Sequence, residues 1–507
     1  MAKILINGDN LTIDDIISVS RYRKSVELSL EAIDKIDESR ETIEELSKKD
    51  LPIYGINTGL GKLCNIKISK DNLSKLQENI VKSHDLTLKP FLSKDAVRAT
   101  LIIRANSLAK GYSGVRREVI ERMILFLNED VVPIMPQKGS LGASGDLIPL
   151  ASLASFLVGK GRGIYKGKEM KSIEIHNKLG IEPLKLLEKE ALSIINGTSF
   201  SLALATLSLY DAKNILKNAL ISSSLSMEAL LALSEPFNTK IHFAKPHTSQ
   251  AIIAYAINSL LEGSTLINSL KDKTQDSYVI RCIPQIYGSI YNTLKFVEKN
   301  LTIEINSSSD NPLVFSDEKI AISGGNFHGS YISTNCDFLS IELTILSNNI
   351  ERRLNRLMNP TLSNGLPPFL IENSGLNTGL MLLQYLASSL VSENRTLSYP
   401  ASVTSSPVSN DQEDDVSMSG TASRKLRQIV DNLFTVISVE MISAVQALNF
   451  RKGKLGRGTQ LAYNVIKDIF PGINKDENLT PYVEKAKEIV TDGSIIKEVE
   501  KEIGELF

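Results

Sequence analysis

The 507-residue sequence lacks the features that mark several large classes of protein. It has only three cysteines, Cys64, Cys282 and Cys336, which lie far apart and show no CxxC spacing. This excludes a secreted disulfide framework and a cysteine-based zinc site, and it favours a reducing compartment. No charge of one sign dominates, because 57 Lys and Arg stand against 58 Asp and Glu, for a net charge of −1. Without a basic excess, a nucleic-acid-binding protein is not expected.

Long uncharged apolar runs are also missing. The most apolar stretches carry charges such as Asp211, Glu262 and Glu440, so no window of about 18 apolar residues predicts a membrane-spanning helix. Acidic residues arrive by Asp9, so no signal-peptide apolar region follows the first lysine. With 42% hydrophobic and 23% charged residues, the composition is that of a folded globular protein, and we expect a cytoplasmic one.

What the sequence does contain is helical periodicity. Apolar residues recur every three or four positions over residues 97–108, after the candidate N-cap Ser93, and over 339–357 and 430–448. Residues 199–233 are apolar almost all round, which predicts a deeply buried pair of helices. Such long helices pack against one another as a bundle.

Strand signals are few and short. They fall at residues 3–6, 301–305 and 313–315. We therefore expect an all-α fold, with a long-helix bundle and C-terminal helical region over residues 199–507. A smaller mixed N-terminal region, residues 1–198, carries two of the glycine-rich loops.

Several common site motifs are excluded. The segment Gly55-Ile-Asn-Thr-Gly-Leu-Gly-Lys62 has the wrong spacing for a phosphate-binding loop, and Leu63 stands where a Ser or Thr would hold magnesium. The acidic residues from Asp411 to Asp415 are typical of an exposed turn, and no histidine stands near them at ligand spacing. No metal or nucleotide is expected.

The triplet Ala143-Ser144-Gly145 predicts an unusual reaction. Three small residues alone are typical of a tight turn. Here Gly142 and Gly145 free the backbone to fold on itself, and Gly145 has no Cβ to keep its nitrogen from a preceding carbonyl. If that nitrogen attacks the Ala143 carbonyl and Ser144 loses water, a five-membered ring with an exocyclic methylidene results. The chain would then carry an electrophile made from itself.

With this triplet in view, the sequence resembles the histidine/phenylalanine/tyrosine ammonia-lyase family. That family's prosthetic group, 4-methylidene-imidazol-5-one (MIO), forms from an Ala-Ser-Gly triplet. Further blocks match in family order: Tyr54-Gly-Ile-Asn-Thr-Gly59, Asn196-Gly-Thr198, Gln275-Asp-Ser-Tyr278 with Arg281-Cys-Ile-Pro-Gln285, Ser323-Gly-Gly-Asn-Phe-His328 and Asn410-Asp-Gln-Glu413. The resemblance covers nearly the whole chain. It implies a fumarase/histidase-like fold and a homotetramer in which three subunits build each active site around an amino acid substrate.

The chemistry explains why an electrophile is needed. The β-hydrogen of an α-amino acid is very weakly acidic, and general base catalysis contributes only about 10²–10⁴. An electrophile with electrostatic support must supply the rest. The resemblance implies that Tyr54 is the base for the β-proton. Since the ordinary pKa of tyrosine is near 10, we expect neighbouring charge or the field of MIO to lower it.

The resemblance implies roles for five further residues. Arg281 would bind the substrate carboxylate, because a planar guanidinium suits a bidentate anion. Asn196 and Gln275 would orient the carboxylate and the MIO carbonyl. Tyr278, grouped with the catalytic residues, and Phe327 would shape the site.

Two positions favour histidine as the substrate. Ser83-His84 reads as in the histidine enzymes, and Glu413 stands where members acting on other aromatic substrates place glutamine. A carboxylate pairs with an imidazole but would be left desolvated beside a phenyl ring. The expected products are trans-urocanate and ammonia.

Other readings stay open. Departures from the histidine enzymes fall at Leu60, Asp85, Ser199, Tyr399 and Asp415. They leave room for a tyrosine or phenylalanine ammonia-lyase, or an aminomutase. Met135-Pro-Gln-Lys138 faintly matches the fumarase/argininosuccinate-lyase group, and an inactive scaffold of the same fold is a third alternative.

Overall fold

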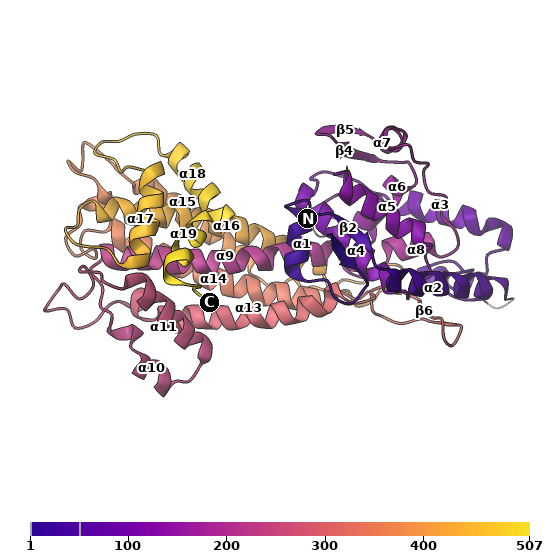
Figure 1. Ribbon diagram of the computed structural model, residues 1–507, viewed down its shortest axis with the longest axis horizontal. Helices are drawn as coiled ribbons and strands as arrows, with labels where there is room; N and C mark the ends of the chain where they lie inside the picture. Colours follow the sequence, from indigo (N-terminus) through magenta and orange to yellow (C-terminus); the bar gives the residue numbers. More distant parts are fainter. Residues whose placement is uncertain (1–2, 50–51) are drawn as a thin grey trace. The chain divides into compact units, whose positions relative to one another are not determined.

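Helices dominate the computed structural model, which describes residues 3–49 and 52–507 (Figure 1). The chain forms two compact units, each assembled from segments far apart in the sequence. The first unit comprises Met1–Leu207, Glu298–Asp337 and Pro400–Arg424. The second comprises Ser208–Val297, Phe338–Tyr399 and Lys425–Phe507. The expected all-α class is confirmed.

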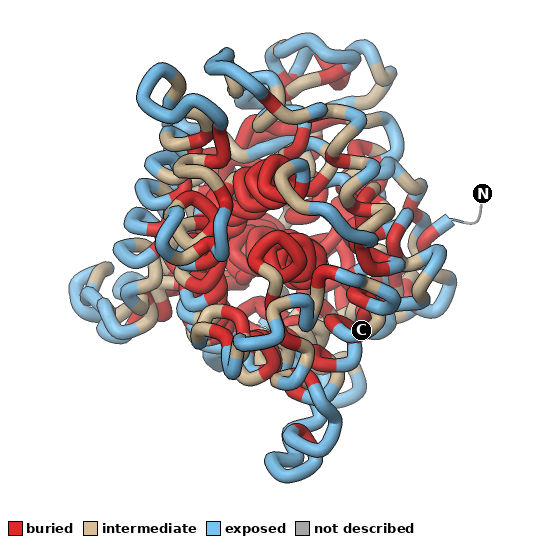
Figure 2. Tube along the Cα trace, turned by 90° about the vertical axis from the view of Figure 1, so that its left-hand side faces the viewer, coloured by how far each residue is buried: buried red, intermediate tan, exposed pale blue. Residues whose placement is uncertain are grey.

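Four long helices contribute residues to both units. They are α9 (Ser199–Ala229), α13 (Ile283–Ile305), α14 (Ser330–Met358) and α16 (Ser419–Leu448). The apolar positions that predicted α14 and α16 from the sequence are buried in the structure. Figure 2 shows helical segments buried along much of their length. Burial of an apolar face, more than local propensity, stabilises helices of this kind.

The first unit combines shorter helices with three small sheets. Its further helices are α1 (Ile13–Ser20), α2 (Leu30–Lys48), α3 (Leu73–His84), α4 (Lys94–Ala109), α5 (Arg117–Asn128), α6 (Leu147–Leu157), α7 (Ser172–Leu179) and α8 (Glu190–Ile195). The strands are β1 (Ile4–Ile6) parallel to β2 (Val26–Leu28), the antiparallel set β3 (Val132–Pro133), β4 (Arg162–Tyr165) and β5 (Lys168–Lys171), and the antiparallel pair β6 (Leu313–Phe315) and β7 (Ile320–Ile322). These sheets are too short to form a core, which the helices supply.

The second unit is helical. Its further helices are α10 (Thr239–Ala244), α11 (Thr248–Leu261), α12 (Tyr278–Arg281), α15 (Met381–Leu397), α17 (Arg457–Ile469), α18 (Thr480–Asp492) and α19 (Ser494–Ile503). Its core contains a fully buried ion pair, in which Arg353 Nε lies 2.7 Å from Glu440 Oε1. Arg353 also donates to the hydroxyl of Tyr287 at 2.9 Å. Buried charges are tolerated when paired and hydrogen-bonded in this way.

The structure agrees with some of the local expectations and contradicts others. Residues 199–229 form one helix, α9, so the predicted helix pair is wrong: no residue in that stretch breaks the backbone ladder. Residues 301–305 were expected as a strand but end α13, because packing decides the state of a short run of Ile and Thr. The strands at 4–6 and 313–315 are confirmed.

One helix of the described residues, α16, is long and apolar enough to cross a membrane by length and composition. Most of its apolar window, 83%, is buried inside the structure. That burial is typical of a core helix.

Candidate active site

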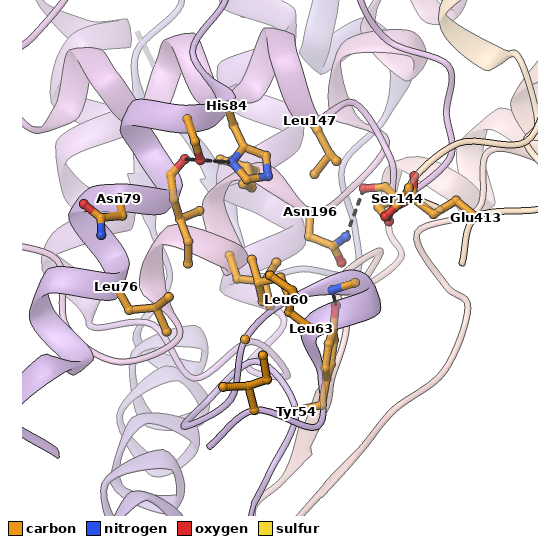
Figure 3. A pocket seen from close by; sticks show the side chains of 18 of the residues that line it. Tyr54, Leu60, Leu63, Leu76, Asn79, His84, Ser144, Leu147, Asn196 and Glu413 are labelled. Atoms are coloured by element: carbon orange, nitrogen blue, oxygen red, sulfur yellow. Dashed lines mark hydrogen bonds between the residues drawn. The ribbon is translucent and has the colours of Figure 1, made fainter. Parts of the chain in front are cut away.

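Two adjoining cavities lie in the first unit. Their volumes are about 550 and 740 Å³, and both are lined by Tyr54, Gly61, Ser144 and Glu413. The central residue of the triplet therefore stands where the two cavities meet. Figure 3 shows the smaller cavity, which also contains His84 and Asn196.

The two cavities differ in polarity. Apolar side chains line most of the smaller one: Leu60, Leu63, Ile66, Ile68, Leu76, Ile80, Leu147, Leu192 and Ile195. The larger one is lined by the carboxylates Glu413, Asp414 and Asp415, together with Phe327 and His328. The smaller cavity thus suits an apolar or aromatic group, and the larger one a polar or cationic group.

The backbone around the triplet is folded as tightly as the sequence predicted. Gly142 and Gly145 both have positive φ, +65° and +72°, in the left-handed region that favours glycine. Gly145 pairs with Gly197, and the amide of Asp146 donates to the Gly197 carbonyl at 2.7 Å. A Cβ on Gly145 would lie 2.3 Å from that carbonyl oxygen. Glycine at position 145 is therefore required by both conformation and space.

Ser144 is held from two sides. Its hydroxyl donates to Glu413 Oε1 at 2.5 Å, and Asn196 Nδ2 donates to its carbonyl oxygen at 2.9 Å (Figure 3). Asn196 is buried, and among the described residues its Oδ1 has no hydrogen-bond partner. An amide donor on the triplet carbonyl and an unused acceptor beside it fit an MIO ring at this position.

Asp146 occupies the N-cap position of helix α6 directly after the triplet, although its side chain makes no capping hydrogen bond to that helix. Its fully buried carboxylate accepts hydrogen bonds from Ser140 Oγ at 2.6 Å and from the Ser201 amide at 2.9 Å. Burial raises the pKa of Asp146 to about 6, although these hydrogen bonds oppose the rise. The carboxyl anchors both the triplet loop and the start of α9.

Tyr54 points its hydroxyl toward the loop at Gly61, whose amide donates to it at 3.4 Å (Figure 3). Burial raises the pKa of Tyr54, the Gly61 bond opposes this, and Cys64 and Glu413 raise it further. The expectation that neighbouring charge lowers this pKa is therefore wrong for the described chain, because the nearby groups that act on the phenol are Cys64 and the carboxylates Glu413 and Asp310. Lowering by the field of MIO stays a prediction.

His84 ends helix α3 and lines the smaller cavity. Its Nδ1 lies 2.8 Å from the Ile80 carbonyl and 2.9 Å from Ser83 Oγ. Because a carbonyl only accepts, the first contact places a proton on Nδ1, and in the neutral ring Nε2 is then the acceptor.

Gln275, Tyr278 and Arg281 form a separate group in the second unit. Arg281 donates to the Gln275 side-chain oxygen, and its guanidinium lies 4.6 Å from the ring centroid of Tyr278. Tyr278 is 67% exposed. Both cavities, as the described residues form them, are lined by first-unit residues, among them Tyr54, His84, Ala143, Ser144, Asn196, Phe327 and Glu413, with Gly145 adjoining, whereas Gln275, Tyr278 and Arg281 line neither.

Sequence reasoning missed most of the apolar wall of the smaller cavity, and it missed Asp146. The wall residues come from four separate segments, so no local pattern reveals them. Asp146 directly follows the triplet, and a carboxylate before an apolar helix is a recognisable capping signal. Of the departures from the histidine enzymes, Leu60 lines the smaller cavity and Asp415 the larger.

Comparison with known proteins identifies the family. The aromatic amino acid lyase model matches residues 11–468. Histidine ammonia-lyase of Caldanaerobacter subterraneus subsp. tengcongensis is 43% identical over 506 residues, which cover 99% of each chain. Two solved structures, each 34% identical, also match: tyrosine aminomutase from Streptomyces globisporus (TM-score 0.94, 99% of each chain) and histidine ammonia-lyase from Trypanosoma cruzi (TM-score 0.91, 99% of this chain and 95% of that one). The chain belongs to the aromatic amino acid lyase family, which confirms the resemblance.

Among residues 3–49 and 52–507, no cluster of three or more His, Cys, Asp or Glu side chains is arranged to hold a metal ion.

Proposed function

We propose that the protein eliminates ammonia from L-histidine to give trans-urocanate, using an MIO group formed from Ala143-Ser144-Gly145. The observation that carries the proposal is the position of Ser144 at the junction of the two cavities, between Glu413 and Asn196. Relatives 43% identical over their full length are histidine ammonia-lyases by name, which supports the same reaction class.

The chain would build the group without help. The Gly145 nitrogen adds to the Ala143 carbonyl carbon, and the carbonyl oxygen leaves as water. Ser144 then loses its Cα proton and its hydroxyl as a second water, which creates the methylidene. The positive φ of Gly142 and Gly145 supports this closure, because it folds the loop before any bond forms. When formed, MIO supplies the electrophile that activates the substrate amine or ring.

The remaining residues bind and orient. Asn196 Nδ2 holds the carbonyl of residue 144, and Glu413 pairs with an imidazole that takes up charge. His84 Nε2 accepts a hydrogen bond from a substrate N–H. Tyr54 removes the β-proton, and the leucine and isoleucine walls exclude water from the ring.

We propose that Gln275, Tyr278 and Arg281 reach the site from another subunit of a homotetramer. Their grouping supports this: Arg281 lies on the Tyr278 ring and bonds to Gln275, so a single subunit presents all three together. Arg281 would bind the substrate carboxylate as a two-pronged donor.

The alternative is a lyase or aminomutase acting on tyrosine or phenylalanine. Leu60 and Asp415, which depart from the histidine enzymes, line the two cavities, and the fold matches a tyrosine aminomutase with a TM-score of 0.94.

A substrate panel on the purified protein separates these readings. L-Histidine should give urocanate absorbance at a rate far above the cinnamate or coumarate formed from phenylalanine or tyrosine. The intact mass should fall short of the sequence mass by two waters per chain. Faster turnover of tyrosine, or β-amino acid products, would favour the alternative. A full-mass chain that is active would contradict both.

A further inference from the structure

Arg104 is a fully buried arginine of α4 that contacts the loop carrying Asn196. Its Nη2 donates to the backbone carbonyl of Asn196 at 2.9 Å and to that of Ser193. Its Nη1 lies 3.5 Å from Ser309 Oγ. None of these contacts is to the triplet or to a cavity-facing side-chain atom, so Arg104 meets the site only through backbone.

The loop is closely packed between Arg104 and the triplet. A Cβ added to Gly197 would lie 2.2 Å from Arg104 Nη1, so the guanidinium occupies the space beside that glycine. A Cβ on Gly145 would lie 2.3 Å from the Gly197 carbonyl oxygen. The Gly197 backbone thus contacts the guanidinium and the triplet loop with no room for a further atom. Movement of the guanidinium would displace Gly197 and, with it, the backbone that Gly145 pairs with.

The free-energy cost of burying the Arg104 guanidinium indicates that this residue does more than fill space. Within the described part of the chain, no carboxylate lies at ion-pair distance from Arg104, and its Nε has no hydrogen-bond partner. Burial lowers the pKa of Arg104 to about 10, while Asp310 and Asp146 oppose the drop, so the group stays charged at neutral pH. Burying a cation that is bonded mainly to carbonyl oxygens lowers the free energy of unfolding, because the charge loses its hydration. A neutral side chain would fill the same volume with a smaller desolvation penalty.

We propose that Arg104 is a positioning residue that fixes Asn196 and Gly197 against the triplet. By holding the two carbonyls of Ser193 and Asn196 with one Nη2, it sets the direction of the Asn196 side chain toward the Ser144 carbonyl. It also sets the surface on which Gly145 folds for ring closure. This role rests on the proposed function, because it concerns formation of the ring and its orientation.

The test is Arg104→Lys, which keeps the positive charge and removes the planar guanidinium with its two Nη donor groups. The expected result is a reduced fraction of chains that lack two waters, measured by intact mass. The kcat per modified chain should fall roughly 10- to 100-fold, with KM changed by less than about threefold, because the geometry of the reacting groups is disturbed while the substrate-binding side chains remain. Dehydration and kcat at wild-type levels in Arg104→Lys would overturn the proposal, whatever happens to stability.

Arg98 in the same helix provides the matched control. It is also buried and donates to the backbone carbonyls of Val19 and Leu127, and unlike Arg104 it forms an ion pair with a carboxylate, Asp130 Oδ1 at 3.1 Å; none of these residues lines the cavities. Arg98→Lys should lower thermal stability to a similar extent and leave the mass deficit and kcat unchanged. Equal losses of ring formation in both variants would show a general folding effect and overturn the assignment to Arg104.

A double variant tests whether Arg104 acts through Asn196. If it does, Arg104→Lys combined with Asn196→Ala should have a kcat per modified chain close to that of Asn196→Ala alone. Losses that multiply would contradict the coupling. The wild type is measured in parallel: an active wild type without the mass deficit contradicts the proposed function itself, whereas a wild-type deficit together with a wild-type kcat in Arg104→Lys contradicts only the role of Arg104.

Discussion

At the scale of single residues, the surroundings decide what each carboxylate can do. Glu413 is half-buried at the junction of two cavities and accepts from Ser144, whereas Asp146 is fully buried and bonded to backbone and hydroxyl donors. Glu413 is free to meet a substrate, and Asp146 is not. A carboxylate therefore anchors a loop at Asp146, whereas at Glu413 it faces the cavities, where the proposed function needs it for ligand recognition.

The first residue-scale prediction concerns specificity. Glu413→Gln keeps the shape of the side chain and removes the negative charge that would pair with an imidazole. Turnover of histidine should fall at least about 100-fold, while any turnover of tyrosine falls far less, because truncating one partner of a desolvated charged pair costs several kcal/mol. Steady-state kinetics on both substrates measure this. An equal loss on both would remove Glu413 from ring recognition.

The second residue-scale prediction concerns Tyr54. Because burial raises the pKa of its phenol, only a small fraction is ionised at neutral pH. If Tyr54 is the base, kcat/KM should rise as pH increases from 7 toward 9.5, since the base must lose its proton before it acts. Tyr54→Phe should abolish most turnover while the mass deficit remains. A pH-independent rate over that range would contradict the assignment.

At the scale of elements, the residue at the start of helix α6 also links that helix to its neighbours. Helix α6 begins directly after the triplet, and its cap residue Asp146 also accepts from Ser201 in the first turn of α9. Two helices and the triplet loop are thereby joined through one carboxyl group. The sequence predicts α4, α14 and α16 well, since a broad apolar face is a local signal, but it does not reveal that α9 is continuous or that α13 extends to Ile305.

The buried carboxyl group of Asp146 predicts a pH dependence of stability. The pKa of Asp146 is about 6 in the folded chain and near 4 in the unfolded one, so the folded state binds the proton more tightly. The contribution of Asp146 to the free energy of unfolding is fully present below about pH 4. It is lost as the pH rises through about 6, and the loss amounts to about 3 kcal/mol. Thermal unfolding from pH 4.5 to 7.5 should show the advantage of wild type over Asp146→Asn shrinking as pH rises. A constant difference would refute the raised pKa.

At the scale of the whole molecule, the residues of the proposed site fall in two compact units of the chain. The residues around Ser144 belong to the first unit, and Arg281 with its neighbours belongs to the second. Exposed apolar side chains on the second-unit helices, such as Phe338, Ile341 and Tyr385, are surface that the proposed homotetramer would cover.

Subunit mixing tests the shared site. Ser144→Ala and Arg281→Met should each be inactive when assembled alone, because one lacks the electrophile and the other the carboxylate partner. If the two groups come from different subunits, random assembly of equal amounts should restore about a quarter of wild-type activity. Coexpression followed by an activity assay on the mixed oligomers measures this. No recovery would mean that a single chain supplies both groups.

The order of blocks along the chain was enough to identify the family, which the comparisons confirm, and to predict the triplet and most of the candidate site residues, because each block is a short local pattern. Only the tertiary structure brought Glu413 to Ser144 across 269 residues and Asn196 to the same serine across 52. It alone revealed the buried guanidinium of Arg104 beside Gly197 and the raised pKa of Tyr54. Burial and long-range contacts depend on how distant segments pack, and no local pattern encodes them.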